Sequence, residues 1–246
     1  MRNYSNHSEN AVEVDSVSKR FHTKDRDSIF SRPGNNPEIT ILDNVSFSVK
    51  KGEMFGVIGR NGIGKTTLLR MIAGIYKPDS GQINTYGSMV PLLSLGTGFN
   101  PELSARDNVI FYGKILGFSH KEITGMLGEI IEFAELEKFK DTKLKKFSTG
   151  MAMRLAFATA IQINPDIILI DEILTVGDQL FQKKSYDTFM KFKEAKKTIV
   201  FVTHDLNSVN SLCDKAILLE GGKIASDGQP SKVVNDYLGM LDAEKT

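Results

Sequence analysis

The sequence predicts an α/β fold with a mainly parallel core sheet, and three observations lead to that prediction. Short apolar runs typical of buried strands recur along the chain, and segments with helical spacing of apolar residues separate them. Strands that alternate with helices favour parallel pairing, because each parallel pair needs a crossover connection. The composition is that of a folded domain, since 41% of the 246 residues are hydrophobic and 25% are charged.

The N-terminal part is predicted to be rich in strands. Apolar and polar residues alternate over 11–21 and over 39–53, as they do in half-buried strands. Between these strands, charged residues, two prolines and a glycine interrupt the pattern at 22–38, in the sequence "HTKDRDSIFSRPGNNPE". We interpret this segment as an insertion in a loop.

The middle of the chain is predicted to pass from strand to helix. A buried strand over 54–59 runs into a helix over 64–73, and short strands follow at 80–87 and 88–93. From 101 to 146 the apolar residues recur mostly at helical spacing. This block is therefore expected to form a group of helices.

The C-terminal part returns to the alternation of strand and helix. The expected elements are a strand over 166–171, a helix over 179–195, a strand over 198–204, a hairpin over 215–228 and a last helix over 230–240. A short helix is expected between the second of these strands and the hairpin.

The overall composition excludes several kinds of protein. A formal net charge of +1 gives no reason to expect nucleic acid as a partner. No run approaches the ~18 apolar residues of a membrane span, and the start "MRNYSNHSEN" is no secretory signal. The one cysteine, Cys213, excludes an internal disulfide and is interpreted as a small core residue.

The sequence "GRNGIGKTT" at 59–67 satisfies the P-loop pattern, in which Gly-x-x-x-x-Gly-Lys-Thr lies between a buried strand and a helix. Glycines let backbone N–H groups surround phosphates, and the helix N-terminus adds partial positive charge. Lys65 is expected to reach the β- and γ-phosphates, Thr66 to bind Mg²⁺ and Thr67 to donate to the α-phosphate. The alternative is a glycine-rich turn that only caps a helix. The nucleotide-binding residues expected here are Gly59, Asn61, Gly62, Gly64, Lys65, Thr66 and Thr67.

Two adjacent carboxylates end the buried strand "IILI". Paired acids at such a position are costly unless positive charge meets them. In a P-loop protein the Mg²⁺ ion of MgATP supplies that charge, with Asp171 as a metal ligand. Glu172 is then placed to polarise a water molecule for attack on the γ-phosphate. The alternative is that both acids only cap a turn and a helix.

The segment "FSTGMAMRLAFATAIQINPDIILIDEILTVGD" resembles the ATP-binding subunit of ABC transporters. The sequence "FSTGM" stands at the family's signature loop, "IILIDE" at its Walker B strand, and "LTVGD", which ends in Asp178, at its D-loop. The resemblance covers residues 11–228. It implies one ABC nucleotide-binding domain over 1–246, with a mainly parallel core sheet, an antiparallel β subdomain and a helical subdomain at about 101–158.

The resemblance also implies roles for residues outside the P-loop. In the family two subunits form a dimer that encloses two ATP molecules, so Ser148 and Gly150 are expected to contact ATP held by a second copy of the chain. His204, in "FVTHD", matches the switch histidine that contacts the γ-phosphate and orients Glu172. Phe21 matches an aromatic residue that stacks on adenine. The alternatives are an ordinary serine helix cap for Ser148 and a core aromatic for Phe21.

Departures from the family pattern narrow the resemblance further. Thr149 replaces a glycine and Met151 a glutamine in the signature, and no glutamine stands between Ser88 and Pro101, where the Q-loop belongs. These sequences resemble the polysaccharide-exporting branch of the family, which moves lipid-linked O-antigen, teichoic acid or a related glycan across the bacterial inner membrane. In that branch the insertion lies near the cytosolic mouth of the transporter.

This resemblance predicts a peripheral ATPase on the cytoplasmic face of the inner membrane. Its expected partners are an integral-membrane transporter subunit and a second copy of the chain, with the glycan reaching it only through the membrane subunit. We expect no nucleic acid partner and no C-terminal carbohydrate-binding domain. The alternatives are an exporter ATPase for lipid, peptide or drug, and a non-transport ABC ATPase.

Overall fold

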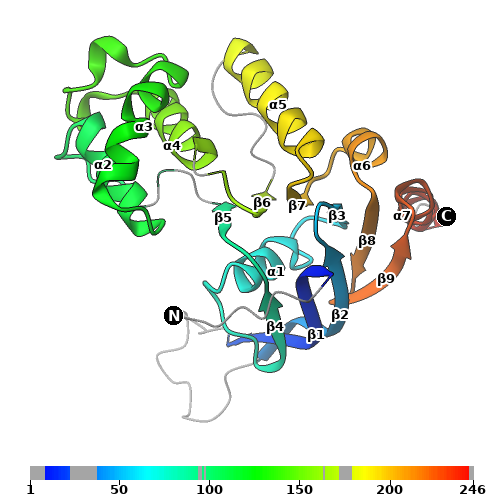
Figure 1. Cartoon of the computed structure of the whole chain (residues 1–246). Coiled ribbons are helices and arrows are strands. Elements are labelled where there is room, and N and C mark those ends of the chain that lie inside the picture. The colour runs from blue at the N-terminus through cyan, green and yellow to red at the C-terminus, as the bar shows by residue number, and fades with distance from the viewer. Residues whose placement is uncertain are drawn as a thin grey trace, which may run out of the picture. The chain divides into compact units, whose positions relative to one another are not determined.

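The computed structural model describes residues 9–22, 38–93, 96, 98–162, 164–171 and 179–243. The chain divides into two compact units, of which unit 1 comprises Met1–Gly87 with Thr198–Thr246, and unit 2 comprises Ser88–Lys197. Figure 1 follows the elements of both units along the chain.

Unit 1 contains an antiparallel sheet with the strand order β2-β1-β4. Its strands are β1 (Asn10–His22), β2 (Glu38–Lys50) and β4 (Ser80–Thr85). His22 pairs with Glu38, so both ends of the expected insertion already belong to strands. The remainder of that insertion, 23–37, lies outside the described residues.

Unit 1 also contains parallel strands in the order β7-β3-β8, with β9 antiparallel to β8. These strands are β3 (Met54–Ile58), β7 (Thr198–Val202), β8 (Lys215–Glu220) and β9 (Lys223–Gly228). Every residue of β3 and β7 is buried, as expected for strands inside a parallel sheet. The predicted parallel sheet and C-terminal hairpin are therefore confirmed.

Three helices belong to unit 1, namely α1 (Lys65–Ile72), α6 (Leu206–Leu212) and α7 (Pro230–Ala243). Cys213 ends α6 and is buried, as predicted for a small core residue. A Cβ atom on Gly56 of β3 would lie 3.0 Å from the Cys213 sulfur atom, so glycine is what allows α6 to approach the sheet this closely.

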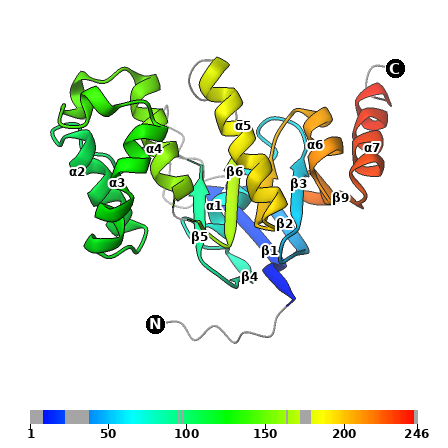
Figure 2. The same ribbon diagram turned by 45° about the horizontal axis from the view of Figure 1, so that its top comes forward.

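Unit 2 pairs β5 (Met89–Leu92) with β6 (Ile167–Asp171) in parallel. Its helices are α2 (Ala105–Ile115), α3 (His120–Phe133), α4 (Thr149–Gln162) and α5 (Gln179–Glu194). Helices α2, α3 and α4 group together in both ribbon views (Figures 1 and 2). Fully buried residues such as Val109, Ile123, Ile130 and Leu155 join them in one apolar core.

The segment before α4 differs from its prediction as helix. It forms two short 3₁₀ helices, η1 (Glu137–Phe139) and η2 (Leu144–Lys146). The physical reason lies in the start of α2, because the Ala105 and Arg106 N–H groups donate to the carbonyls of Thr142 and Lys140. These bonds direct the carbonyls of this segment toward α2 and so stabilise a backbone that is not a continuous α-helix.

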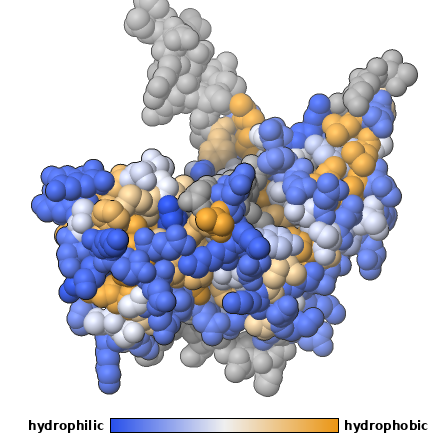
Figure 3. All heavy atoms as spheres, turned by 90° about the horizontal axis from the view of Figure 1, so that it is seen from above, coloured by the Kyte–Doolittle hydropathy of each residue, from blue (hydrophilic) through white to orange (hydrophobic). Residues whose placement is uncertain are grey.

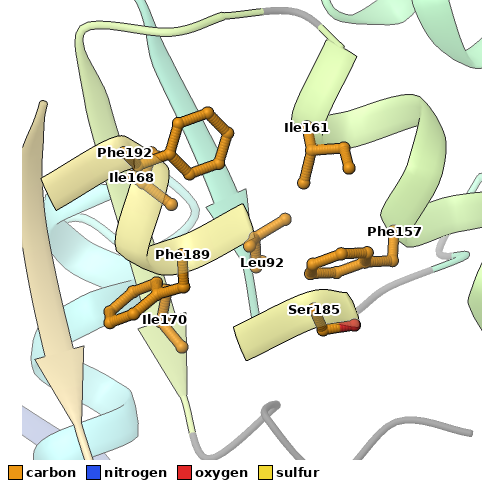
Figure 4. Close-up of a pocket in the computed structure, with 8 residues that line it drawn as sticks. All are labelled: Leu92, Phe157, Ile161, Ile168, Ile170, Ser185, Phe189 and Phe192. Carbon is orange, nitrogen blue, oxygen red and sulfur yellow. The ribbon is translucent and has the colours of Figure 1, made fainter. Parts of the chain in front are cut away.

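A small apolar pocket lies inside unit 2 among strands β5 and β6 and helices α4 and α5 (Figure 4). Its one polar side chain is Ser185, which is 1% exposed and whose Oγ has no hydrogen-bond partner among the described residues. The lining residues are Leu92, Phe157, Ile161, Ile168, Ile170, Ser185, Phe189 and Phe192.

No helix among the described residues combines the length and the apolarity that a membrane span requires. The surface seen in Figure 3 is mostly hydrophilic, and its hydrophobic residues lie in separate patches. One exposed apolar pair lies in unit 2, where Phe111 and Ile115 are one turn apart on α2.

Candidate functional site

The loop between β3 and α1 has a backbone that only glycine adopts readily. Gly59, Gly62 and Gly64 have φ angles of 147°, 79° and 112°. A Cβ atom on Gly59 would lie 2.5 Å from the Leu219 carbonyl oxygen of β8, and one on Gly64 would lie 2.8 Å from a methyl group of Ile41. Two of these glycines are therefore required for close approach as well as for their dihedral angles.

Lys65 is the first residue of α1, and its side chain lies within the loop. It is 6% exposed, and its Nζ donates hydrogen bonds of 2.7 Å to the Gly59 carbonyl and 2.9 Å to the Arg60 carbonyl. A buried ammonium needs such partners, because its desolvation is otherwise costly. The loop thus fixes a positive charge beside its own backbone.

The N-terminus of α1 suits an anion. Its N-cap, Gly64, provides no side-chain hydrogen bond, and the first turn contains no acidic residue. The first N–H groups of a helix have no partners inside it and form the positive end of its dipole. Thr66 and Thr67 are half-buried in this turn, and Asn61 is exposed in the loop. The open helix end and the Lys65 ammonium therefore belong to the same loop and helix, as the P-loop pattern predicted.

His204 emerges at the same edge of the unit 1 sheet as the loop. Strands β3 and β7 run parallel, and Val57 pairs with Val202. Gly59 and His204 each follow two residues after these partners, so both leave the sheet in the same direction. His204 is exposed.

The turn after His204 is fixed by hydrogen bonds. Asp205 caps α6 by accepting from the Asn207 N–H at 3.0 Å, and its own N–H donates to the buried Thr203 hydroxyl at 3.0 Å. A hydrogen bond from the Ser208 hydroxyl lowers the pKa of Asp205, as the nearby His204 also does. These contacts hold the backbone on both sides of the histidine.

The acidic strand end lies in unit 2. Asp171 is the last residue of β6 and is half-buried. Glu172 and Asp178 lie outside the described residues. Among the residues that the structure describes, no group of three or more His, Cys, Asp or Glu side chains is placed to hold a metal ion.

Ser148 directly precedes α4 and acts as its cap. Its Oγ accepts from the Met151 N–H at 3.2 Å, and its carbonyl accepts from the Ala152 N–H at 3.1 Å. The first turn of α4 contains no acidic residue, and a Cβ atom on Gly150 would meet only the Ser148 Oγ, at 3.9 Å. The cap predicted as an alternative is present, and the helix end around it is open.

Phe21 lies near the end of β1 in unit 1, where it pairs with Ile39 of β2. Two residues further along β2, Ile41 contacts Gly64 of the loop. Phe21 is 37% exposed, and its ring meets the ring of Tyr76 edge to face, with centroids 5.7 Å apart. Sequence reasoning missed Tyr76, because a single aromatic residue in a turn has no periodic pattern to mark it.

Comparison with known proteins places this arrangement in a family. A family model described as "ABC transporter" matches residues 42–175, which is more than half of the chain. The chain belongs to the ABC transporter family. The predicted family is thereby confirmed.

Relatives of this ABC transporter chain include named export proteins. It is 47% identical to the O-antigen export system ATP-binding protein RfbB of Myxococcus xanthus over 199 residues. These residues make up 81% of this chain but only 46% of that relative. It is 40% identical to the teichoic acids export ATP-binding protein TagH of Staphylococcus epidermidis over 240 residues. That alignment covers 96% of this chain and 90% of that relative. The chain therefore spans less than half of one relative and most of the other.

Solved structures support the fold of the ABC chain. An ATP-binding cassette in a dimeric post-hydrolysis state with ADP and Pi has a TM-score of 0.71 and 25% identity, and covers 89% of this chain and 98% of that one. An ATP-binding subunit of an ABC transporter has a TM-score of 0.74 at 22% identity, and the match covers 95% of this chain and 98% of that subunit. The predicted cassette fold is confirmed by these likenesses.

Proposed function

We propose that this chain binds MgATP in its P-loop and hydrolyses it to drive the export of a lipid-linked glycan across the bacterial inner membrane. The observation that carries the ATPase proposal is the buried Lys65 ammonium, fixed by two loop carbonyls beside an uncapped helix N-terminus. The glycan proposal is supported by relatives named for O-antigen and teichoic acid export.

Phosphate binding follows from the partners of Lys65. Its amine exchanges the carbonyls of Gly59 and Arg60 for oxygens of the β- and γ-phosphates, which carry full negative charge. The loop N–H groups and the positive end of the α1 dipole add to this attraction. The Thr67 hydroxyl donates to the α-phosphate, and the ring of Phe21 stacks on adenine.

The donor groups expected at a magnesium site fit that ion. The Thr66 hydroxyl and the Asp171 carboxylate are hard oxygen ligands, which Mg²⁺ prefers. Mg²⁺ in such sites takes few protein ligands and completes its shell with phosphate oxygens and water, so a larger cluster of protein carboxylates is not needed. Bound Mg²⁺ offsets negative charge that develops on the phosphate oxygens.

Hydrolysis requires a base and a group that orients it. Glu172 accepts a proton from the attacking water, and His204 hydrogen-bonds the γ-phosphate and holds Glu172 in position. The fixed turn at Thr203 and Asp205 supports this role, because it limits the positions that the imidazole can take.

A homodimer completes each site in this proposal. Ser148 and Gly150 at the open end of α4 contact ATP bound to the partner copy, and Asp178 of the D-loop also contributes to nucleotide binding. The open helix end of α4 and the dimeric state of a similar solved cassette support this arrangement.

Transport requires an integral-membrane partner, which holds the chain at the cytoplasmic face of the membrane. Residues 22–38 and 92–112 are proposed to contact that partner, and the exposed Phe111 on α2 supports an apolar contact there. The same chemistry with lipid, peptide or drug as cargo is the second candidate. The names of the relatives favour glycan over these cargoes.

ATP hydrolysis is tested with the full chain and its membrane partner. Glu172→Gln is expected to retain ATP binding and to lower kcat by ~10²-fold or more, because the general base is lost. Glu129→Gln on the exposed face of α3 is the control and is expected to leave kcat unchanged. A near-normal kcat in Glu172→Gln contradicts the assignment of the base.

Cargo is tested in the native cell with a Lys65→Ala chain, which keeps the subunit but cannot bind ATP productively. Lipid-linked glycan is expected to accumulate on the cytoplasmic side, where it stays accessible to cytosolic enzymes and is absent from the cell surface. Normal surface glycan together with loss of a lipid, peptide or drug export activity would instead establish the second candidate.

A further inference from the structure

The ring of Phe21 is contacted by Tyr76, which follows the P-loop helix in sequence, and by Lys19 of its own strand. The Tyr76 ring meets it at an interplanar angle of 71° with a centroid distance of 5.7 Å. The Lys19 ammonium lies 5.4 Å from the Phe21 centroid. Phe21 nevertheless remains 37% exposed, so part of its ring stays open to a ligand.

Tyr76 is in turn fixed to α1. The Arg70 Nη1 donates to the Tyr76 hydroxyl at 3.3 Å, and the guanidinium carbon lies 5.7 Å from the centre of the tyrosine ring. The Tyr76 N–H donates to the Arg70 carbonyl at 3.2 Å. Ring and backbone of Tyr76 are therefore both attached to the same residue of α1.

A second link joins this turn to the end of β1. The Asp79 carboxylate accepts from the Lys19 Nζ at 2.9 Å and from the Arg20 N–H at 2.6 Å, and its own N–H donates to the Ser18 carbonyl at 2.9 Å. These bonds hold the backbone immediately before Phe21. The hydrogen bond from Lys19 also lowers the pKa of Asp79.

We propose that Tyr76 is a positioning residue that sets the distance between the adenine platform and the phosphate site. The inference rests on the proposed function, in which Phe21 stacks on the adenine of ATP. Because α1 begins with Lys65 and also carries Arg70, one rigid helix fixes the groups that hold the phosphates and, through Tyr76, the ring that holds the base. A nucleotide binds both places at once only when their spacing matches its length.

Calorimetric titration of the full chain with MgATP and with magnesium tripolyphosphate tests this inference. Tyr76→Ala is expected to weaken ATP binding about two- to ten-fold, the size of an aromatic pair contact, and to leave tripolyphosphate binding unchanged. Tyr76→Phe keeps the ring and is expected to bind ATP within about two-fold of the parent chain. Tyr237→Ala on α7 is the matched control, with no expected effect.

Removal of the platform itself completes the test. Phe21→Ala is expected to weaken ATP binding about ten-fold or more, since a stacked base is lost. Adding Tyr76→Ala to Phe21→Ala should then have no further effect, because a positioning residue has nothing left to position. If Tyr76→Ala does not fold, Tyr76→Leu takes its place in every comparison.

The possible failures are distinguishable. Equal losses for ATP and tripolyphosphate, or additive effects of Tyr76→Ala and Phe21→Ala, would overturn the positioning role. A normal ATP affinity for Tyr76→Ala alongside a weakened one for Phe21→Ala would also overturn it and leave the proposed function intact. A normal ATP affinity for Phe21→Ala would refute the adenine platform itself.

Discussion

Removal of the buried Ser185 hydroxyl is predicted to stabilise the chain, although most substitutions at buried positions destabilise a protein. Its Oγ lies in the apolar pocket of unit 2 (Figure 4) without a hydrogen-bond partner among the described residues. A buried polar group left unpaired costs about 1–3 kcal/mol, whereas the cavity left by one removed oxygen atom costs less. Ser185→Ala is therefore expected to raise the free energy of unfolding by about 1 kcal/mol.

Thr159→Val is the matched control for Ser185→Ala. The Thr159 hydroxyl is also fully buried in unit 2, but it donates to the Leu155 carbonyl at 2.7 Å. Replacing it by a methyl group of similar size removes that bond and is expected to lower the free energy of unfolding by about 0.5–1.5 kcal/mol.

Urea denaturation and thermal unfolding of the three chains measure these changes. An increase of about 1 kcal/mol corresponds to a rise in Tm of about 2–4 °C for a chain of this size. ATP binding should be the same in all three, which separates packing effects from effects on the P-loop. A Ser185→Ala chain that is less stable than the parent by about 1 kcal/mol would refute the reasoning.

Two further predictions concern the P-loop and the turn after His204. Gly64→Ala should weaken ATP binding at least ten-fold, because at a φ of 112° its Cβ atom would lie 2.8 Å from an Ile41 methyl group. Gly74→Ala is the control and should lower only stability, because Gly74 has a φ of 73° and its Cβ atom would meet no atom within 4 Å. Equal ATP affinities of the two variants in calorimetry would contradict this prediction. Asp205→Ala should lower the free energy of unfolding by about 1 kcal/mol near pH 7, since α6 loses its cap. The pKa of Asp205 is lowered in the folded chain. Its contribution to the free energy of unfolding is therefore present above the unfolded pKa of about 3.9 and is lost as pH falls through the folded pKa. Urea denaturation at about pH 2 that still finds the full difference in stability between Asp205→Ala and the parent chain would contradict this prediction.

Much of the fold and of the P-loop was predictable because both have regular sequence patterns. The strand that ends at Ile58 and the helix that begins at Lys65 lie where the apolar spacing and the glycine motif predicted them. The glycines at 59 and 64, which the P-loop pattern singled out, have φ angles of 147° and 112° that other residues rarely adopt. Local rules were sufficient here, since every necessary residue is within one short stretch of chain.

Features that depend on contacts between distant residues were not predictable in this way. The stretch that ends at Lys146 has helical spacing, but carbonyls at 140 and 142 bond to the start of α2 instead. Tyr76 becomes relevant only through Phe21, from which it is 55 residues distant in sequence. The pocket at Ser185 depends on how four separate elements pack. A local sequence pattern does not predict any of these contacts.

The close approach of Leu219 to Gly59 has a consequence for the order of events during synthesis. The P-loop motif is complete once Thr67 has been added, yet the carbonyl against which the first glycine packs belongs to β8, about 150 residues later. At roughly 5–20 residues per second, that delay is about 10–30 s. The strand β7, which flanks β3 and leads to His204, also arrives late. A nascent chain that already carries the whole motif therefore still lacks one wall of its binding loop, and ATP becomes a ligand of this protein only after β8 has been added.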